Sequence, residues 1–344
     1  MLLDLSRSGP SKSTLLAGTS GSGKSVLLRA AIMRGIDLGY KYIILETKSG
    51  DPADFLPWYP EIEPYISQSS DPDTIAALLK SDRNDLSILI DVCDEGDTWE
   101  QIYTKLEKEM NNQKRHPLER KDAKMVHHFL GNLIEEMKTI KKIRNNLHDI
   151  PLVSVMDLRK LSENMQKLIA GSTAQWILNF AEDTIFIVDE YHKQGHNKML
   201  EAYAAEGRSK GDFLIASDQN ITKIPSDMRQ NFQEWIFFRQ NDRVKAQRVA
   251  DQVIGLNIKF KDAMNLKTGE CYVNDYNEGT SEKIFVWGDW YSREDAIKVA
   301  RGIISYKDVG KVPPPPAKIP LKPREEDWSD VMSVVVAVRE LIRI

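Results

Sequence analysis

The stretch Gly18-Thr19-Ser20-Gly21-Ser22-Gly23-Lys24-Ser25 fits the phosphate-binding pattern G-x-x-x-x-G-K-[ST] at every position. Its glycines allow consecutive backbone N–H groups to surround a β-phosphate, while Lys24 places a charge between the β- and γ-phosphates and the Ser25 hydroxyl can ligate Mg²⁺. Residues 13–17 predict a buried strand before the loop, and residues 26–32 predict a helix after it whose N-terminus faces the anion. The alternative is a glycine-serine turn that happens to carry a lysine. The strand–loop–helix context favours a nucleotide pocket.

A pair of carboxylates follows a second apolar run. Residues 184–188 predict a buried strand, and Asp189 and Glu190 come directly after it, which is the Walker B form. At the tip of such a strand Asp189 would hold Mg²⁺ beside Ser25, and Glu190 would orient or deprotonate the attacking water. Many strands end in acidic turns, so the pair alone is weak evidence for a catalytic site. The phosphate loop upstream in the same chain favours the catalytic interpretation.

Further apolar runs of strand length indicate a mainly parallel α/β sheet flanked by helices. Helices are expected at 162–180 and 293–304, and a small β element at 269–273 and 283–287. The remaining predicted strands cover residues 41–46, 86–92, 151–156, 212–219 and 234–239.

The segment from about 94 to 148 differs from the rest because it is highly charged and lacks strand signals. Helical stretches are expected at 99–110 and 123–144, so the segment is predicted as a helical insertion in an ATPase domain spanning residues 1–310. Two interpretations remain open: a solvated helical hairpin that only packs, or an element that contacts another subunit or DNA. Residues 311–344 are expected to form a proline-rich linker and a C-terminal helix.

Gln219 ends the predicted strand 212–219 with a polar amide. If that strand lies between the strands that precede the phosphate loop and Asp189, the amide can touch the γ-phosphate or its attacking water and sense hydrolysis. The alternative is a helix N-cap or a turn residue.

Composition and charge limit the classes of partner. The chain has 344 residues and a formal net charge of −4, so contact with nucleic acid must come from a local basic surface. Two cysteines, Cys93 and Cys271, are too few for a disulfide framework, which fits a reducing compartment. No apolar run approaches the roughly 20 residues of a membrane span, so a cytoplasmic protein without an anchor is expected.

With these motifs in order, the chain resembles the FtsK/HerA superfamily of DNA-pumping P-loop ATPases over about residues 10–300. The loop at 18–25 is similar to the family's G-T-x-G-S-G-K-S, and residues 189–192 are similar to its D-E-A-H, with Tyr191 in place of the small residue.

A second group of motifs extends the resemblance. Residues 206–211, followed by an apolar strand and Gln219, look like the family's E-G-R-K-x-G, strand, A-T-Q sequence. Ser217-Asp218 stand where Ala-Thr is expected, so this sequence departs from the family just before the sensor position. Residues 237–243 and 266–273 track the strand, turn and G-E-rich strand that follow.

The resemblance implies a RecA-like (ASCE) sheet in a ring, expected to be a hexamer, with ATP and Mg²⁺ at the subunit boundaries and double-stranded DNA through the centre. In that arrangement a neighbour's arginine enters each site, because its planar donor fork compensates charge that develops on the γ-phosphoryl group. Arg208 is the first candidate, from the E-G-R position, and Arg243 is the second, from the turn after the strand 234–239. The alternative for each is a surface or ion-paired arginine.

The function that the resemblance implies is ATP-driven translocation of double-stranded DNA, with packaging of a viral genome as the leading task. A capsid vertex or a nuclease would be a further partner, and the host cytoplasm or the virion the location. The short N-terminus before the loop favours the packaging motor. The alternatives are a HerA-like repair or conjugation motor, and a nucleotide-gated assembly protein. Candidate DNA contacts lie in the helical insertion and around residues 193–198, a short basic stretch directly after the Walker B motif.

Overall fold

A computed structural model of the chain describes residues 12–47, 55–67, 75, 87–94, 96–195, 197–219, 221–224, 226–276, 279–286 and 292–309. The linker and helix predicted for residues 311–344 lie outside these residues, so the predicted boundary at residue 310 stays a prediction.

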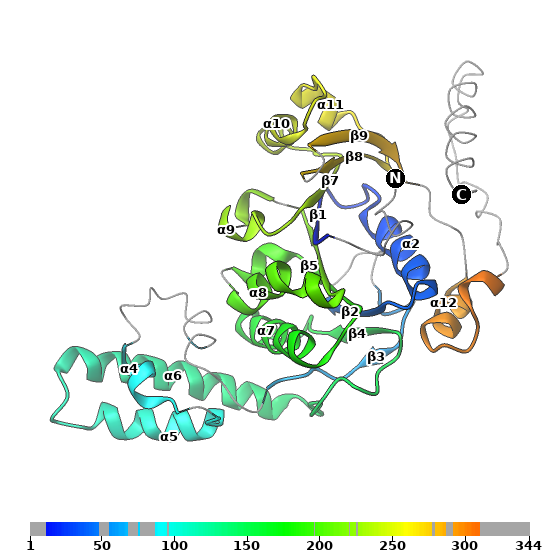
Figure 1. Cartoon of the computed structure of the whole chain (residues 1–344). Coiled ribbons are helices and arrows are strands. Elements are labelled where there is room, and N and C mark those ends of the chain that lie inside the picture. The colour runs from blue at the N-terminus through cyan, green and yellow to red at the C-terminus, as the bar shows by residue number, and fades with distance from the viewer. Residues whose placement is uncertain are drawn as a thin grey trace, which may run out of the picture.

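In the described residues, nine strands form one sheet in the order β3-β4-β2-β5-β6-β1-β7-β8-β9 (Figure 1). Neighbours from β3 to β7 are parallel, whereas β8 and β9 are added antiparallel to β7. The mainly parallel α/β sheet predicted from the sequence is therefore confirmed. The strands are β1 (Thr14–Ala17), β2 (Lys41–Glu46), β3 (Glu61–Ile62), β4 (Val153–Asp157), β5 (Thr184–Asp189), β6 (Phe213–Asp218), β7 (Glu234–Phe238), β8 (Glu270–Asp275) and β9 (Thr280–Phe285).

Strand order places the functional segments together. β6 lies between β1 and β5, as the interpretation of Gln219 required. The register pairs Ala17 with Asp218 and Asp189 with Ser217, so β1, β5 and β6 end at the same edge of the sheet. Carboxyl ends of parallel strands are where open α/β sheets bind ligands.

Helices cover both faces of the sheet. Figure 1 shows α2 (Lys24–Asp37) and α12 (Arg293–Ala300) on one face, and α7 (Glu163–Phe180) and α8 (Lys198–Glu206) on the other. Alternate residues of β2 divide between the two cores: Tyr42 and Ile44 join the α2 side, whereas Ile43 and Leu45 join the α7 side. This alternation is expected for a strand buried on both faces. The remaining elements of the sheet domain are α9 (Ser226–Arg229), α10 (Arg243–Gln252), α11 (Phe260–Met264), and the short 3₁₀ helices η2 (Tyr191–Gln194), η3 (Gly207–Lys210), η4 (Ile221–Lys223) and η5 (Tyr306–Asp308).

Residues 87–139, which we call the helical arm, project away from the sheet (Figure 1). The arm consists of α4 (Ser87–Val92), α5 (Trp99–Met110) and α6 (Pro117–Thr139). The helix predicted at 99–110 is confirmed. The helix predicted at 123–144 starts and ends earlier, because Pro117 suits the first helical position and Ile140 leaves the helix in an extended conformation.

The strand predicted at 86–92 is wrong, because Ser87–Val92 form α4. An apolar run of six or so residues does not by itself distinguish a strand from a buried helix turn. Ile88 and Leu89 are buried against the arm, whereas the Ile90 side chain is 69% exposed, a division that a helix makes and a strand buried on both faces does not.

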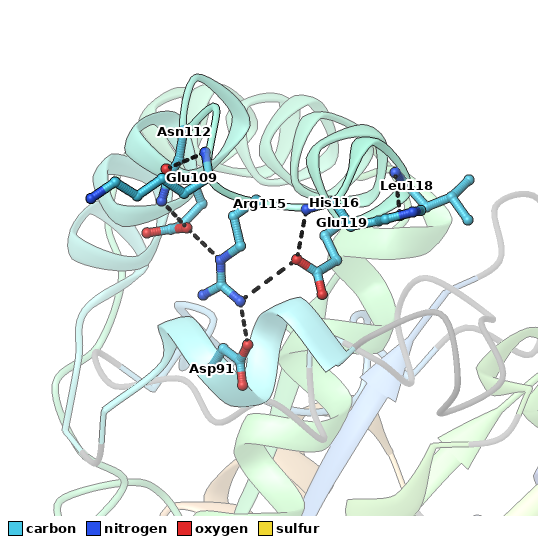
Figure 2. A network of polar contacts seen from close by, with 8 residues as sticks. Asp91, Glu109, Asn112, Arg115, His116, Leu118 and Glu119 are labelled. Atoms are coloured by element: carbon cyan, nitrogen blue, oxygen red, sulfur yellow. Dashed lines mark hydrogen bonds and ion pairs between the residues drawn. The ribbon is translucent and has the colours of Figure 1, made fainter.

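Arg115 ties the three helices of the arm together (Figure 2). Its Nε lies 2.7 Å from Glu109 of α5, and one terminal nitrogen lies 2.6 Å from Asp91 of α4 and 3.8 Å from Glu119 of α6. The hydrogen bonds to Glu109 and Asp91 raise the pKa of the guanidinium further above its usual value. The arm is therefore held by charge pairs at its outer turn as well as by its apolar core.

No helix in the described parts of the chain combines the length and the apolar composition needed to cross a membrane.

Candidate functional site

Backbone hydrogen bonds attach the phosphate loop to the ends of β6 and β7. The N–H of Gly18 donates to the carbonyl of Asp218 at 3.1 Å, and the N–H of Thr19 donates to the carbonyl of Arg239 at 3.0 Å. The loop then enters α2 at Lys24, so the first-turn N–H groups of that helix face the loop. This arrangement confirms the strand–loop–helix prediction.

Glycine is required at two loop positions for different reasons. A Cβ on Gly18 would lie 2.5 Å from the Cβ of Phe238, so β7 leaves no room for a side chain. Gly23 has φ 117° and a Cβ there would lie 3.1 Å from Gly269, whose N–H donates to the Ser22 carbonyl at 2.9 Å. The start of β8 therefore packs directly on the loop.

Lys24 turns back over the loop that precedes it. Its ammonium donates to the carbonyl of Gly18 and, at 3.1 Å, to the carbonyl of Thr19. The charge is thus held at the mouth of the loop, where it can interact with an anion.

Asp189 and Glu190 occupy the end of β5. Asp189 lies beside Ser217 of β6, and desolvation raises the pKa of its carboxyl, with the neighbouring charge of Glu190 acting in the same direction. Glu190 is 8% exposed and has φ 51° and ψ 47°, in the left-handed region that non-glycine residues rarely adopt. Backbone strain of this kind is typical of functional sites, where surrounding contacts must hold it.

Gln219 contacts Glu190 directly. Its side-chain Nε2 donates to Oε1 of Glu190 at 3.0 Å. The amide therefore lies directly after β6 and beside the carboxylate, and its role as a sensor stays a prediction.

These groups line one cavity of about 220 Å³ at the carboxyl edge of the sheet. The lining residues are Thr19, Ser20, Gly21, Ser22, Gly23, Lys24, Ser25, Val26, Leu28, Arg29, Glu46, Phe55, Asp189, Glu190, Ser217, Gln219 and Thr268. Gly18 does not line the cavity, and it attaches the loop to β6 through its N–H.

The two candidate arginines lie elsewhere. Arg208 is in η3, which precedes β6, so it is at the opposite end of that strand from Gln219. Arg243 begins α10, and its guanidinium stacks 4.8 Å from the centre of the Phe260 ring. Both side chains are exposed and neither lines the cavity, so one chain does not bring them to Glu190. Their role in a neighbour's site stays a prediction.

Two groups at this edge were not predicted. Asp218, fully buried, accepts from the backbone N–H of His192 at 2.7 Å and lies 3.0 Å from its ring Nδ1. That hydrogen bond raises the pKa of His192, although partial burial acts in the opposite direction. Asp218 and His192 come together because of the register between β5 and β6, and no local sequence pattern predicts this contact.

Glu46 is the second unpredicted group. It ends β2, lines the cavity, and accepts from the N–H groups of Phe55 at 2.9 Å and Leu56 at 3.2 Å. A carboxylate at the end of a predicted parallel strand was a usable signal, because such ends share the ligand-binding edge.

The residues at this edge fit a nucleotide with Mg²⁺. The Ser25 hydroxyl and the Asp189 carboxylate are hard oxygen ligands of the kind that Mg²⁺ prefers. The Ser22 hydroxyl is buried and has no hydrogen-bond partner among the described residues, which suits a loop built to receive an anion.

A parallel sheet with β6 between β1 and β5, a glycine loop leading into α2, and carboxylates after β5 define the RecA-like P-loop NTPase fold. Solved structures share it. The plasmid coupling protein TrwB in complex with ADPNP has a TM-score of 0.63 at 13% identity, covering 83% of this chain and 88% of that chain. VirB4 of Thermoanaerobacter pseudethanolicus has a TM-score of 0.62 at 14% identity, covering 84% and 92%.

The genome-packaging NTPase B204 from Sulfolobus turreted icosahedral virus 2 has a TM-score of 0.45 at 12% identity, covering 80% of this chain and 98% of that chain. The RecA-like fold expected from the sequence is confirmed by its likeness to TrwB and VirB4. No protein-family model matches the sequence, and a search of curated proteins gives no significant match.

Proposed function

We propose that this chain is an ATP-hydrolysing motor that moves double-stranded DNA, with packaging of a viral genome as its leading task. The observation that carries the hydrolytic part is the contact between Gln219 and Glu190 in the same cavity as the phosphate loop. A loop alone supports nucleotide binding, whereas a carboxylate oriented beside it supports attack by water.

The motif residues of the cavity then have distinct roles. The loop N–H groups and Lys24 bind the phosphates, and Ser25 and Asp189 would hold Mg²⁺. Bound Mg²⁺ would neutralise charge on the β- and γ-phosphates. Glu190 orients or deprotonates the attacking water, and Gln219 fixes Glu190 and senses the γ-phosphate.

The same proposal includes a ring of subunits. Since neither Arg208 nor Arg243 lines its own chain's cavity, each is available to a neighbour's cavity, where a guanidinium would compensate charge developing on the γ-phosphoryl group. Arg208 stays the first candidate. A hexamer around duplex DNA is the assembly that we propose.

A conjugation motor is the second candidate. The observation that favours it is the likeness to TrwB, a plasmid coupling protein, over most of both chains. Packaging and conjugation use the same proposed chemistry and differ in the partner at the ring.

The test is the steady-state rate of ATP hydrolysis with linear duplex DNA, with single-stranded DNA, and without DNA. We expect duplex DNA to stimulate the wild type and Glu190→Gln to bind ATP without turnover. Displacement of a triplex-forming strand from the duplex would then report movement. A hydrolysis rate indifferent to DNA would contradict translocation and leave the nucleotide-gated assembly protein as the better explanation.

A further inference from the structure

Two side chains lie beside the Glu190 carboxylate, one at each of its oxygens. Gln219 donates to Oε1 at 3.0 Å, and the ring Nδ1 of His192 lies 3.7 Å from Oε2. His192 is in turn bound by Asp218, the residue next to Gln219 in the chain. Gln219 therefore bonds one oxygen of the carboxylate, and Asp218, the last residue of β6, holds the ring that lies beside the other oxygen.

The contact between Asp218 and His192 is built as an anchor. Asp218 is fully buried and accepts both the backbone N–H of His192, at 2.7 Å, and its ring Nδ1, at 3.0 Å. The carboxylate acceptor requires the proton on Nδ1, so the ring orientation is fixed as well as its position. Hydrogen bonds to a charged partner are stronger than neutral ones.

This anchor also bears on the backbone of Glu190. A non-glycine residue at φ 51° persists only when its surroundings over-determine it. His192 follows Glu190 by two residues in η2, so fixing the N–H of His192 fixes the turn that gives Glu190 its direction.

We propose that Asp218 and His192 are positioning residues that orient the Glu190 carboxylate toward the attacking water. The inference rests on the proposed function, since it assumes that Glu190 acts in hydrolysis. It assigns a task to the aspartate that stands where the resembling family has threonine.

The experiment measures kcat, KM and nucleotide affinity for Asp218→Ala, His192→Ala and His192→Asn. Loss of orientation should lower kcat at least about tenfold in both alanine variants, with the dissociation constant for a fluorescent ATP analogue changed less than about twofold. His192→Asn keeps a side-chain N–H that can reach Asp218, so it should recover most of the lost rate. Ser162→Ala, which removes the N-cap of α7 at a residue that does not line the cavity, serves as the stability control.

A second measurement separates positioning from general stability. In single turnovers with radiolabelled ATP, Asp218→Ala should lower the rate of the wild type but not the residual rate of Glu190→Gln, because it acts through Glu190. Equal losses in both backgrounds would overturn the inference, as would unchanged kcat in His192→Ala. A wild type that hydrolyses no ATP even with duplex DNA would instead overturn the proposed function, and this inference with it.

Discussion

The side chains of Gln219 and Glu190 are joined by a 3.0 Å hydrogen bond that bridges the ends of two neighbouring parallel strands. The phosphate loop hangs from the same β6 end through the carbonyl of Asp218. A shift of β6 would therefore move the loop and the carboxylate together.

Replacement of Gln219 by alanine should slow hydrolysis without loss of nucleotide binding. The loop and Lys24 remain, but Glu190 loses the donor on Oε1, so kcat should fall at least about tenfold and the dissociation constant for ATP should stay within about twofold. Steady-state kinetics and equilibrium binding measure the two quantities. A fall in affinity with kcat unchanged would mean that Gln219 contacts the nucleotide rather than Glu190.

Two inactive variants should complement one another if the site is shared between subunits. Glu190→Gln disables the chain's own cavity, whereas Arg208→Ala would disable the neighbour's, so each alone should bind ATP and hydrolyse it poorly. With random mixing in equal amounts, about a quarter of the interfaces combine an intact glutamate with an intact arginine, so about a quarter of the wild-type rate should return.

The same mixture made with Arg243→Ala tests the second candidate. If the hydrolysis rate returns in the mixture with Arg243→Ala, and Arg208→Ala alone is fully active, Arg243 would become the first candidate for the trans arginine. Both single variants retaining wild-type turnover would contradict a trans arginine at either position.

Gly23→Ala should abolish nucleotide binding and lower the melting temperature. The new Cβ would meet Gly269 at 3.1 Å and the residue would be held at φ 117°, so the loop must shift. Gly39→Ala is the matched control, because Gly39 has φ 95° with open space around a Cβ. It should lower the melting temperature through backbone strain alone and leave ATP binding intact. Equal ATP affinities of the two variants would contradict the role of the Gly23–Gly269 contact.

Glu234 should make stability fall as the pH rises. Its carboxyl is buried beside Thr14, and desolvation raises its pKa from 4.5 to about 7. Between these values the folded chain holds a proton that the unfolded chain has released, so the free energy of unfolding decreases with increasing pH. By pH 8 this decrease in the free energy of unfolding is complete. It amounts to about 3 kcal/mol, at about 1.4 kcal/mol per pKa unit.

Glu234→Gln removes that titration while keeping an acceptor for Thr14. Urea unfolding at pH 5 and at pH 8 should show the variant gaining on the wild type at the higher pH. Parallel pH dependence of the two proteins would contradict a raised pKa at Glu234.

Arg115→Ala should loosen α4 and leave the sheet unaffected. The pairs with Asp91, Glu109 and Glu119 are partly exposed, so the cost is of the order of 1 kcal/mol. Hydrogen exchange should rise in 87–92 more than in β1 or β5. Lys138→Ala breaks an exposed pair with Glu135 within α6 and should change exchange little. Equal exchange in α4 of the wild type and Arg115→Ala would show that the apolar core alone holds the arm.

The sequence predicted the parts of the site that local patterns determine. Lys24 belongs to the motif that follows one strand, and Asp189 and Glu190 belong to the motif at the end of another. The structure places all three in one cavity. The contact of Asp218 with His192 depends on the register between β5 and β6, which residue spacing does not contain. Leu89 and Ile90 show the same limit at the level of the fold, since packing on the arm decided between helix and strand.

The position of β1 sets the order in which the chain can be completed during synthesis. Thr14 pairs with Ile215 on one side and with Glu234 on the other, so the strand that carries the phosphate loop gains both neighbours only after β6 and β7 have left the ribosome. The helical arm closes through contacts within residues 87–139 and has no such delay. The phosphate loop is therefore translated well before the strands that support it, and a ribosome-stalled chain that ends before β6 should be unable to hold a nucleotide.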